Sequence, residues 1–224
     1  SFWIRQPRRE VGHMEASYVT IQTEATAELV IEKSRFITYM GKAETVEEVH
    51  RFIDRIKAEH PLATHHCWAY ITGEGGTQQK ANDDGEPSGT AGRPILEVLV
   101  KQGLRDTVCV VVRYFGGIKL GAGGLIRAYS QAAKEGVLAA GLAKKSLHRK
   151  LSVTIDYPWL GSVEKAIQQR GRKIADITYL EKVTLTLYCP LGMEEEDQAW
   201  LRNLTNGQAE LSLGGHVYLE EPLP

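Results

Sequence analysis

The chain has 224 residues, of which 42% are hydrophobic and 25% are charged, and 27 lysines and arginines against 28 aspartates and glutamates give a formal net charge of −1. This composition is typical of a folded globular protein and excludes the disordered and fibrous classes. The longest uninterrupted apolar run is the five residues 108–112. A membrane-spanning helix needs about 20 such residues, so a membrane-spanning protein is excluded.

The start of the chain and its cysteine content indicate the cellular compartment of the protein. Residues 1–13 carry three arginines without periodicity and precede Met14, so we interpret them as an expression tag or a disordered tail, with a native basic tail as the alternative. No charged segment followed by an apolar one resembles a secretory signal. Cys67, Cys109 and Cys189 lie in apolar segments and form no CxxC pair, which indicates reduced thiols in the cytoplasm.

Apolar periodicity before residue 141 predicts an α/β sandwich. Thr45 and Glu48 form a capping box that starts a helix, and this helix ends at His60 before a proline. The apolar run within 106–114 does not alternate with polar residues, so this strand is expected to lie in the centre of a sheet with both faces buried. The expected elements are strands at 18–22 and 29–40, the helix to 60, a strand at 65–72, a polar loop at 73–88, a helix ending at 103, a strand at 106–114 and a helix at 123–141.

A second set of elements follows residues 141–146, which we interpret as a linker. Its order, read from the same periodicities, is βαββαβ, that of the ferredoxin-like split unit. We therefore expect an α+β protein of two domains, residues 14–142 and residues 147–224. The expected elements are a strand around 151–155, a helix around 160–167, a hairpin of 173–180 and 183–189, a helix around 194–204 and a strand around 209–213.

The charges are unevenly distributed along the chain. Between Lys101 and Arg149 there are nine basic residues and only two acids, Asp106 and Glu135, so this window carries +7 in a chain of −1. A basic stripe on a nearly neutral protein favours a polyanionic partner. The alternative is a solvated helix face, and the sequence leaves both interpretations open.

The glycine-dense segment 113–124 joins the end of a predicted strand to the start of a predicted helix. Glycine lets backbone amides approach a ligand closely, and a helix N-terminus adds positive potential, so the segment suits phosphate binding. It matches neither a Walker loop nor a dinucleotide-binding fingerprint. The alternative is a tight turn with close helix–sheet packing. The residues expected to bind phosphate are Arg113, Lys119, Arg127, Gly116, Gly117, Gly121, Gly123 and Gly124.

Residues 65–70 place two histidines and a cysteine on one predicted strand. Alternation puts His65 and Cys67 on one face and His66 on the other. Residues two apart on a strand are separated by about 6.6 Å, too far for a direct His–Cys hydrogen bond of about 3 Å. We therefore expect Cys67 to pack in the core, and the other cysteines offer no zinc-ligand spacing.

Three carboxylates, Asp83, Asp84 and Glu86, lie in the loop ahead of the second predicted helix. They could hold a divalent cation, but their spacing lacks the alternation of a calcium loop. We favour a turn shaped by Asp84-Gly85, with Ser88 or Thr90 capping the helix, and we expect no metal and no cofactor.

Four motifs in this order resemble the IMPACT family in its bacterial form: residues 33–36, 65–70, 83–92 and 113–121. The resemblance extends from Met14 to Pro224. It implies a first domain like domain IV of elongation factor G, with a ribosomal-protein-like fold, and a ferredoxin-like second domain like its domain V. Eukaryotic relatives regulate translation by restraining an initiation-factor kinase through an additional amino-terminal domain. This chain does not contain that domain, so kinase regulation does not transfer.

Two hypotheses of different classes follow, with a third kept beside them. The first is a non-enzymatic RNA- or ribosome-binding protein that contacts phosphates through the basic window, stacks bases on an aromatic near it and acts in the regulation of translation. The second is a nucleotide- or phosphoester-processing enzyme in which the glycine loop holds phosphate. The third is an adaptor that docks a protein partner on the second domain. The candidate aromatics are Trp68, Tyr70, Tyr114 and Phe115, and the candidate catalytic residues are His65, His66, Asp83, Asp84 and Glu86.

Overall fold

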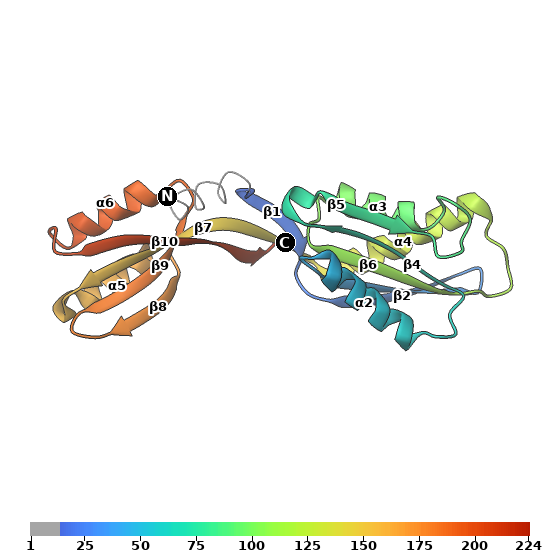
Figure 1. Cartoon of the computed structure of the whole chain (residues 1–224), viewed down its shortest axis with the longest axis horizontal. Coiled ribbons are helices and arrows are strands. Elements are labelled where there is room, and N and C mark those ends of the chain that lie inside the picture. Colours follow the sequence, from blue (N-terminus) through green and yellow to red (C-terminus); the bar gives the residue numbers. More distant parts are fainter. Residues whose placement is uncertain (1–13) are drawn as a thin grey trace. The chain divides into compact units, whose positions relative to one another are not determined.

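The computed structural model describes residues 14–224, which divide into two compact units (Figure 1). The larger unit comprises Tyr18–Lys145 and Glu220–Pro224. The smaller unit comprises Ser146–Leu219 together with residues up to Ser17. The expected tag or tail, residues 1–13, lies outside the described residues. The predicted α+β class with two domains is confirmed.

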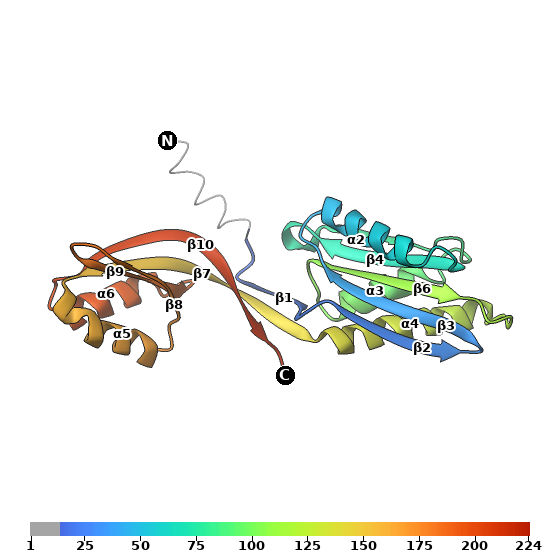
Figure 2. The same ribbon diagram turned by 90° about the horizontal axis from the view of Figure 1, so that it is seen from below.

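Within the described residues, the larger unit is built on a five-stranded sheet of order β2-β3-β6-β4-β5 in which neighbouring strands are antiparallel. Helix α2 covers one face of this sheet, and α3 and α4 cover the other (Figures 1 and 2). In chain order the elements are β2 (Ala25–Ile31), β3 (Ser34–Lys42), α2 (Val46–Glu59), β4 (His65–Thr72), β5 (Gln78–Asn82), α3 (Gly92–Lys101), β6 (Thr107–Tyr114) and α4 (Gly121–Ala140).

Strand β6 is the central strand, as its unbroken apolar run predicts. Val108 and Val110 pack under α2, while Cys109 and Val111 pack under α3 and α4. A strand covered by helices on both faces needs apolar residues at every position, which explains why alternation is missing from its sequence.

The predicted capping box of α2 is present. The amide of Glu48 donates to the Thr45 hydroxyl at 3.2 Å, and the Glu48 carboxylate accepts from the amide of Glu44 at 2.8 Å. These two bonds satisfy backbone donors that the helix itself leaves unpaired, so the helix starts where the sequence predicts.

Two expectations for the larger unit are wrong. Residues 29–40 are not one strand, because Glu32 and Lys33 form a turn with φ of 47° and 63° between β2 and β3. Neither residue is glycine, asparagine or aspartate, the types that usually signal such a turn. The predicted loop 73–88 contains β5, which is a polar edge strand without apolar alternation and therefore left no strand pattern in the sequence.

The smaller unit has the predicted βαββαβ order. Its sheet has the order β1-β7-β9-β8, with β10 also paired to β7. Helices α5 and α6 supply Val163, Ile167 and Leu201 to its core. The strands of this sheet and its helices are β1 (Ser17–Ile21), β7 (Leu142–Ile155), α5 (Leu160–Gln169), β8 (Ile174–Tyr179), β9 (Val183–Pro190), α6 (Glu194–Leu204) and β10 (Glu210–Pro222). Residues 18–21 of β1, 142–145 of β7 and 220–222 of β10 belong to the larger unit.

The linker expected at residues 141–146 is instead the beginning of β7. Ala143 and Leu147 are buried, so this segment is packed and not a free connection. The last residues also differ from the expected boundary, because the Leu223 amide donates to the Leu142 carbonyl at 2.8 Å and Glu220 pairs with Lys42 at 2.9 Å. Residues 220–224 therefore belong to the larger unit.

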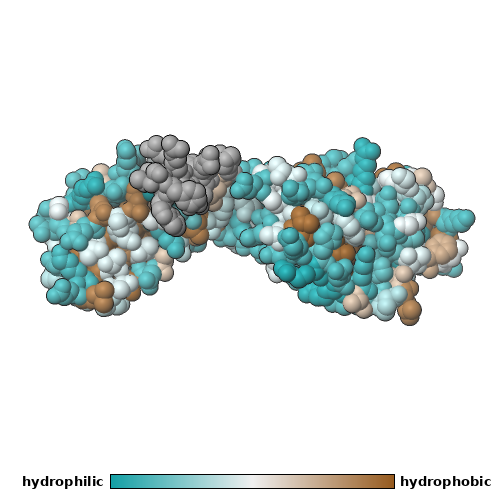
Figure 3. Space-filling view, in the orientation of Figure 1, coloured by the Kyte–Doolittle hydropathy of each residue, from teal (hydrophilic) through white to brown (hydrophobic). Residues whose placement is uncertain are grey.

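The surface shown in Figure 3 is mostly hydrophilic, with small separate apolar areas. None of the helices in residues 14–224 has the length and hydropathy that crossing a bilayer requires. The three cysteines are buried and unbonded to one another, as expected for reduced thiols.

Candidate functional site

Three motifs that lie far apart in the sequence meet at one end of the larger sheet. His65 at the start of β4 is paired in register with Arg113 near the end of β6. Glu86, from the loop between β5 and α3, lies between them. Its carboxylate accepts from Arg113 at 2.9 and 3.0 Å and lies 2.8 Å from His65 Nε2.

This charged cluster is almost completely removed from water. The side chains of Glu86, Arg113 and His65 are 4%, 5% and 18% exposed. His65 Nδ1 lies 2.8 Å from the Asp84 carbonyl oxygen, so both of its ring nitrogens face acceptors. Arg113 and His65 therefore share one buried carboxylate.

Arg113 is a positioning residue and not a surface phosphate ligand, which corrects the expectation for this residue. Its remaining nitrogens donate to the Ser34 hydroxyl at 3.2 and 3.4 Å, and that hydroxyl also accepts from the Gly116 amide at 3.2 Å. The guanidinium lies 5.5 Å from the ring centroids of both Phe36 and Phe115. Its donors are committed to internal partners, and it holds the Phe115 ring in place.

The acidic loop between β5 and α3, which carries Asp83, Asp84 and Glu86, is held in its conformation by hydrogen bonds to its own carboxylates. Asp83 accepts hydrogen bonds from the amides of Gly89, Ala91 and Gly92 at 2.9–3.1 Å. Burial by itself raises the pKa of Asp83, but these three bonds outweigh it and hold the pKa below its ordinary value. Asp84 accepts from the His66 amide at 2.7 Å. In residues 14–224 no group of three or more histidines, cysteines, aspartates or glutamates is arranged to hold a metal ion.

His66 and Cys67 also have internal partners. His66 Nε2 lies 2.7 Å from the His60 carbonyl oxygen, and its Nδ1 lies 3.5 Å from the Asp84 carboxylate. Cys67 Sγ lies 3.1 Å from the Asp83 carbonyl oxygen, and burial raises the pKa of its thiol far above the ordinary value. The five residues considered for catalysis are thus gathered at one place, but both histidines use both ring nitrogens in internal contacts.

The glycines of the turn before α4 have different roles. A Cβ on Gly116 would lie 2.1 Å from the backbone of Lys33, so Gly116 is required for packing against the β2–β3 turn. Gly117 and Gly121 have φ of +89° and +73°, and no described atom would meet a Cβ there within 4 Å. A Cβ on Gly123 would lie 3.3 Å from the Arg127 guanidinium, and one on Gly124 would lie 3.0 Å from Leu120.

An open pocket of about 390 Å³ lies above the charged cluster. Phe115, which is 47% exposed, forms part of its wall, and no side chain of the described residues caps the first turn of α4 at its edge. A neighbouring hollow of about 550 Å³ shares Lys119 and Leu120 with this pocket and includes Arg127. The residues that line the pocket are Thr64, His65, Glu86, Pro87, Arg113, Phe115, Lys119, Leu120, Gly121, Ala122 and Leu125.

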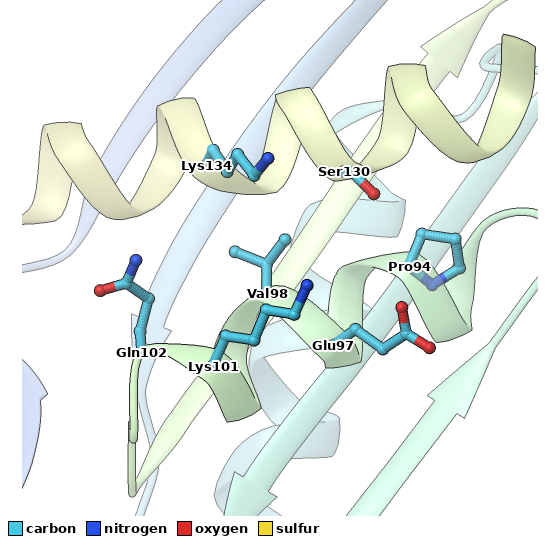
Figure 4. A pocket seen from close by; sticks show the side chains of 7 residues that line it. All are labelled: Pro94, Glu97, Val98, Lys101, Gln102, Ser130 and Lys134. Carbon is cyan, nitrogen blue, oxygen red and sulfur yellow. The ribbon is translucent and has the colours of Figure 1, made fainter.

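Basic side chains continue along the two helices beside the pocket. Figure 4 shows Lys101 of α3 and Lys134 of α4 on either side of a small hollow between the helices. Arg127 lies two turns before Lys134 on α4, about 10 Å away on the same face. These two residues are exposed together with Lys101 and Lys119, and no ion pair joins any of the four to another residue of the described chain. We call the set Lys101, Lys119, Arg127 and Lys134 the α3–α4 basic face.

The rest of the predicted basic window does not extend this face. Arg105 packs against Gly76, and Lys145 lies 3.8 Å from Glu44. Arg149 donates to the Gly214 carbonyl at 3.1 Å in the smaller unit. Lys144 is exposed but lies on β7. The +7 window is therefore not one continuous stripe, and most of its exposed cations lie on α3, on α4 and in the turn before α4.

Of the four aromatics considered for stacking, Phe115 alone is strongly exposed. Trp68 and Tyr70 are buried under α2 and stacked on each other, with ring centroids 5.8 Å apart. The hydroxyl of Tyr114 lies 2.6 Å from His60 Nδ1. Core packing explains two of the four aromatics, Trp68 and Tyr70.

Comparison with known proteins gives a consistent family assignment. Residues 32–137 match the family model of the Impact N-terminal domain, and residues 153–208 match a domain of unknown function (DUF1949). The IMPACT family member YvyE of Bacillus subtilis is 46% identical over 205 residues, covering 92% of this chain and 94% of its own. The chain belongs to the IMPACT family. The family member YigZ of Escherichia coli is 36% identical over 183 residues, covering 81% and 90% of the two chains.

A solved structure supports the same family fold. The crystal structure of a hypothetical protein has a TM-score of 0.59 and 34% identity with this chain, covering 88% of this chain and 97% of its own. The buried cluster, the pocket and the α3–α4 basic face all lie within the segment that matches the Impact N-terminal domain.

Several residues of the site were missed by the sequence interpretation. Ser34 lies in a motif used for the family resemblance, but nothing in its spacing shows that it binds Arg113. No sequence pattern points to Thr64, yet its hydroxyl accepts a hydrogen bond from the Phe115 amide at 3.0 Å. Leu120 lies in the glycine-dense segment and Leu125 in the predicted helix, and only the turn geometry places them in a pocket wall. A protein partner on the smaller unit stays a prediction. The exposed large apolar residues of the smaller unit are Tyr157, Tyr179, Leu180 and Leu191.

Proposed function

We propose that the protein binds single-stranded RNA, free or within the ribosome, through the α3–α4 basic face, and that it acts in the cytoplasm in the regulation of translation. The observation that carries this proposal is the concentration of four exposed cations without carboxylate partners on α3, on α4 and in the turn before α4. Cations in such an arrangement neutralise backbone phosphates and release their counterions. The enzymatic alternative is not proposed, because the histidines that would move protons are held by internal acceptors.

The hollows along α4 support a chain-like ligand. Lys119 and Arg127 line one hollow, and Lys101 and Lys134 line another further along the same helix. Ser130 and Gln131 lie between Arg127 and Lys134 on the helix and add polar groups to these hollows. A flexible single strand can follow such a row of cations, whereas a compact anion would use only one of them.

The test is fluorescence anisotropy of a labelled single-stranded RNA, of duplex RNA and of ribosomes over a series of salt concentrations. Each phosphate contact on a single strand contributes about −0.7 to the slope of log affinity against log salt concentration, so four contacts give a slope of about −3. Lys119→Ala and Arg127→Ala are each expected to weaken binding and to reduce the slope by about 0.7.

Matched controls lie on the opposite face of the sheet. Arg51 and Lys57 are exposed cations of α2, so Arg51→Ala and Lys57→Ala remove the same charges as the two test variants. They are expected to leave the affinity and the slope unchanged. Binding that does not weaken with salt, or that weakens equally in the control variants, would contradict the proposal.

A further inference from the structure

The pocket above the buried cluster has two chemically distinct parts. Its walls are apolar and include Pro87, Phe115, Leu120, Ala122 and Leu125. Its floor holds the charged cluster, and Lys119 lies among its lining residues. A volume of about 390 Å³ falls in the usual range for small-ligand sites, and apolar walls with a few converging polar groups are typical of such sites.

Phe115 is held in position before any ligand arrives. Its amide donates to the Thr64 hydroxyl at 3.0 Å, and the Arg113 guanidinium lies over its ring at 5.5 Å. Glu86 fixes that guanidinium with two hydrogen bonds, so the buried cluster acts as a support for the aromatic ring. Because Phe115 is still 47% exposed, it offers surface for a flat ligand to stack on.

The charges around the pocket favour an anionic ligand. On its floor the Arg113 guanidinium is offset by the Glu86 carboxylate, so Lys119 leaves the pocket lining with a net positive charge. The ligand that satisfies both parts has a flat apolar body and a negative group attached to it. A nucleotide has this chemistry, with its base for the Phe115 wall and its phosphate for Lys119.

We infer that this pocket takes one unstacked nucleotide of the bound RNA, its base against Phe115 and its phosphate beside Lys119. The inference rests on the proposed function and adds the base-binding position to it. Lys119 and Leu120 also line the hollow that contains Arg127, so the phosphate of the next nucleotide passes directly onto the α3–α4 basic face. A free mononucleotide has the same chemistry, and the experiment separates the two sources.

The experiment uses the full chain and fills the pocket without changing a charge. Ala122 is exposed on the first turn of α4 and lines the pocket, so Ala122→Trp occupies the space of the base. Ala139→Trp places the same side chain at an exposed position near the other end of the helix and is the matched control. Phe115→Leu keeps an apolar side chain but removes the stacking surface. Circular dichroism and thermal unfolding show whether each variant is folded.

The probes are labelled hexauridylate, the same oligonucleotide with one abasic position at each site in turn, and the four ribonucleoside monophosphates with their nucleosides. Ala122→Trp and Phe115→Leu are each expected to weaken hexauridylate binding about tenfold or more, the effect of losing one stacked base. Ala139→Trp is expected to have no effect. To the unmodified protein, one of the abasic oligonucleotides is expected to bind as weakly as hexauridylate binds to Ala122→Trp. To Ala122→Trp, the same abasic oligonucleotide is expected to bind no more weakly than hexauridylate does.

The outcomes separate the inference from the proposed function. If Ala122→Trp and Phe115→Leu bind hexauridylate as tightly as the unmodified chain, and binding still falls with salt and in Arg127→Ala, the pocket inference is overturned and the basic face stands. If monophosphates bind, Ala122→Trp abolishes their binding and no RNA binds, the pocket is a free-nucleotide site and the inference of an RNA position is overturned. Loss of RNA affinity in the pocket variants, with monophosphates binding more weakly than hexauridylate, supports the inference that the pocket takes one nucleotide of the bound RNA.

Discussion

Glu86 is the residue on which the cluster of the larger unit depends. Its carboxylate is the shared partner of Arg113 and His65, and all three side chains are mostly or fully buried. A buried ion pair is a weak source of net stability, but removing one partner leaves the other charge in a medium of low polarity without compensation. The cluster is therefore sensitive to single substitutions, even though it contributes little net stability when complete.

We expect Glu86→Ala to lower the free energy of unfolding by about 3–5 kcal/mol, because the buried Arg113 guanidinium loses its carboxylate. Urea denaturation followed by circular dichroism measures this change. Glu28→Ala is the control, since it removes the carboxylate of the exposed Arg35–Glu28 pair, and it is expected to have a much smaller effect. Equal effects of the two substitutions would show that the buried cluster is not held together as described.

At the scale of the element, α4 is constrained by how closely it packs on the sheet. A Cβ on Gly136 would lie 2.5 Å from Thr38 Cγ2 and 2.9 Å from Met40 Sδ. The Thr38 hydroxyl also donates to the Ala132 carbonyl at 3.0 Å, which holds the helix against β3. This close approach fixes where the first turn of α4 stands, and with it one edge of the pocket.

A pair of glycine substitutions tests this packing. Gly136→Ala is expected to destabilise the protein by about 1–3 kcal/mol, because the added methyl group has no space. Gly161→Ala in α5 adds the same group where no described atom lies within 4 Å, so it is expected to stabilise by about 0.5–1 kcal/mol through the higher helix propensity of alanine. Urea midpoints measure both, and a stabilising Gly136→Ala would be inconsistent with the close approach.

At the scale of the whole molecule, each unit contains an aspartate that stabilises it in the ionised form. Asp83 clamps the acidic loop of the larger unit, as described above. In the smaller unit, Asp197 is fully buried and accepts from Arg170 at 3.0 Å and from Arg172 at 2.7 and 3.0 Å. Burial by itself raises the pKa of Asp197, but hydrogen bonds from Arg172, Cys189 and Arg170 outweigh it and hold the pKa below its ordinary value.

The lowered pKa values of Asp83 and Asp197 predict how the free energy of unfolding changes at acid pH. A carboxyl whose pKa is lower in the folded state binds more protons when unfolded, so its contribution is complete above the unfolded pKa of about 3.9 and is lost as the pH falls through the folded value. We expect urea midpoints to fall below about pH 4 for this reason. Asp197→Asn should lower the midpoint at neutral pH, because Arg170 and Arg172 lose their partner, and should flatten the dependence on pH.

The control for this prediction is Asp54→Asn. Asp54 is exposed on α2, so its replacement is expected to leave the pH dependence unchanged. An Asp197→Asn variant with the same acid dependence as the unmodified chain would mean that Asp197 titrates alike in the folded and unfolded states.

Local sequence patterns determined the parts of this protein that depend on neighbouring residues. The Thr45 cap, the helix that follows it, the central strand around Val110 and the βαββαβ order of the smaller unit were predicted because capping and apolar periodicity act within a few residues. The turn at Glu32 and Lys33 and the continuation of β7 through 141–146 were missed. The first is a two-residue hairpin turn made of residue types that do not usually signal a turn, and in the second, strand pairing continues through a segment with a weak local signal.

The tertiary structure alone decided the chemistry of the site. Arg113 and Lys119 read as equivalent cations six positions apart in one motif, yet one is buried against Glu86 and the other is exposed at a pocket. Which of them is free depends on strand register and on the path of the acidic loop, since the partner of Arg113 lies 27 positions away. A sequence shows which charges a chain carries, but whether a charge meets a counter-charge or the solvent is decided by contacts between distant segments.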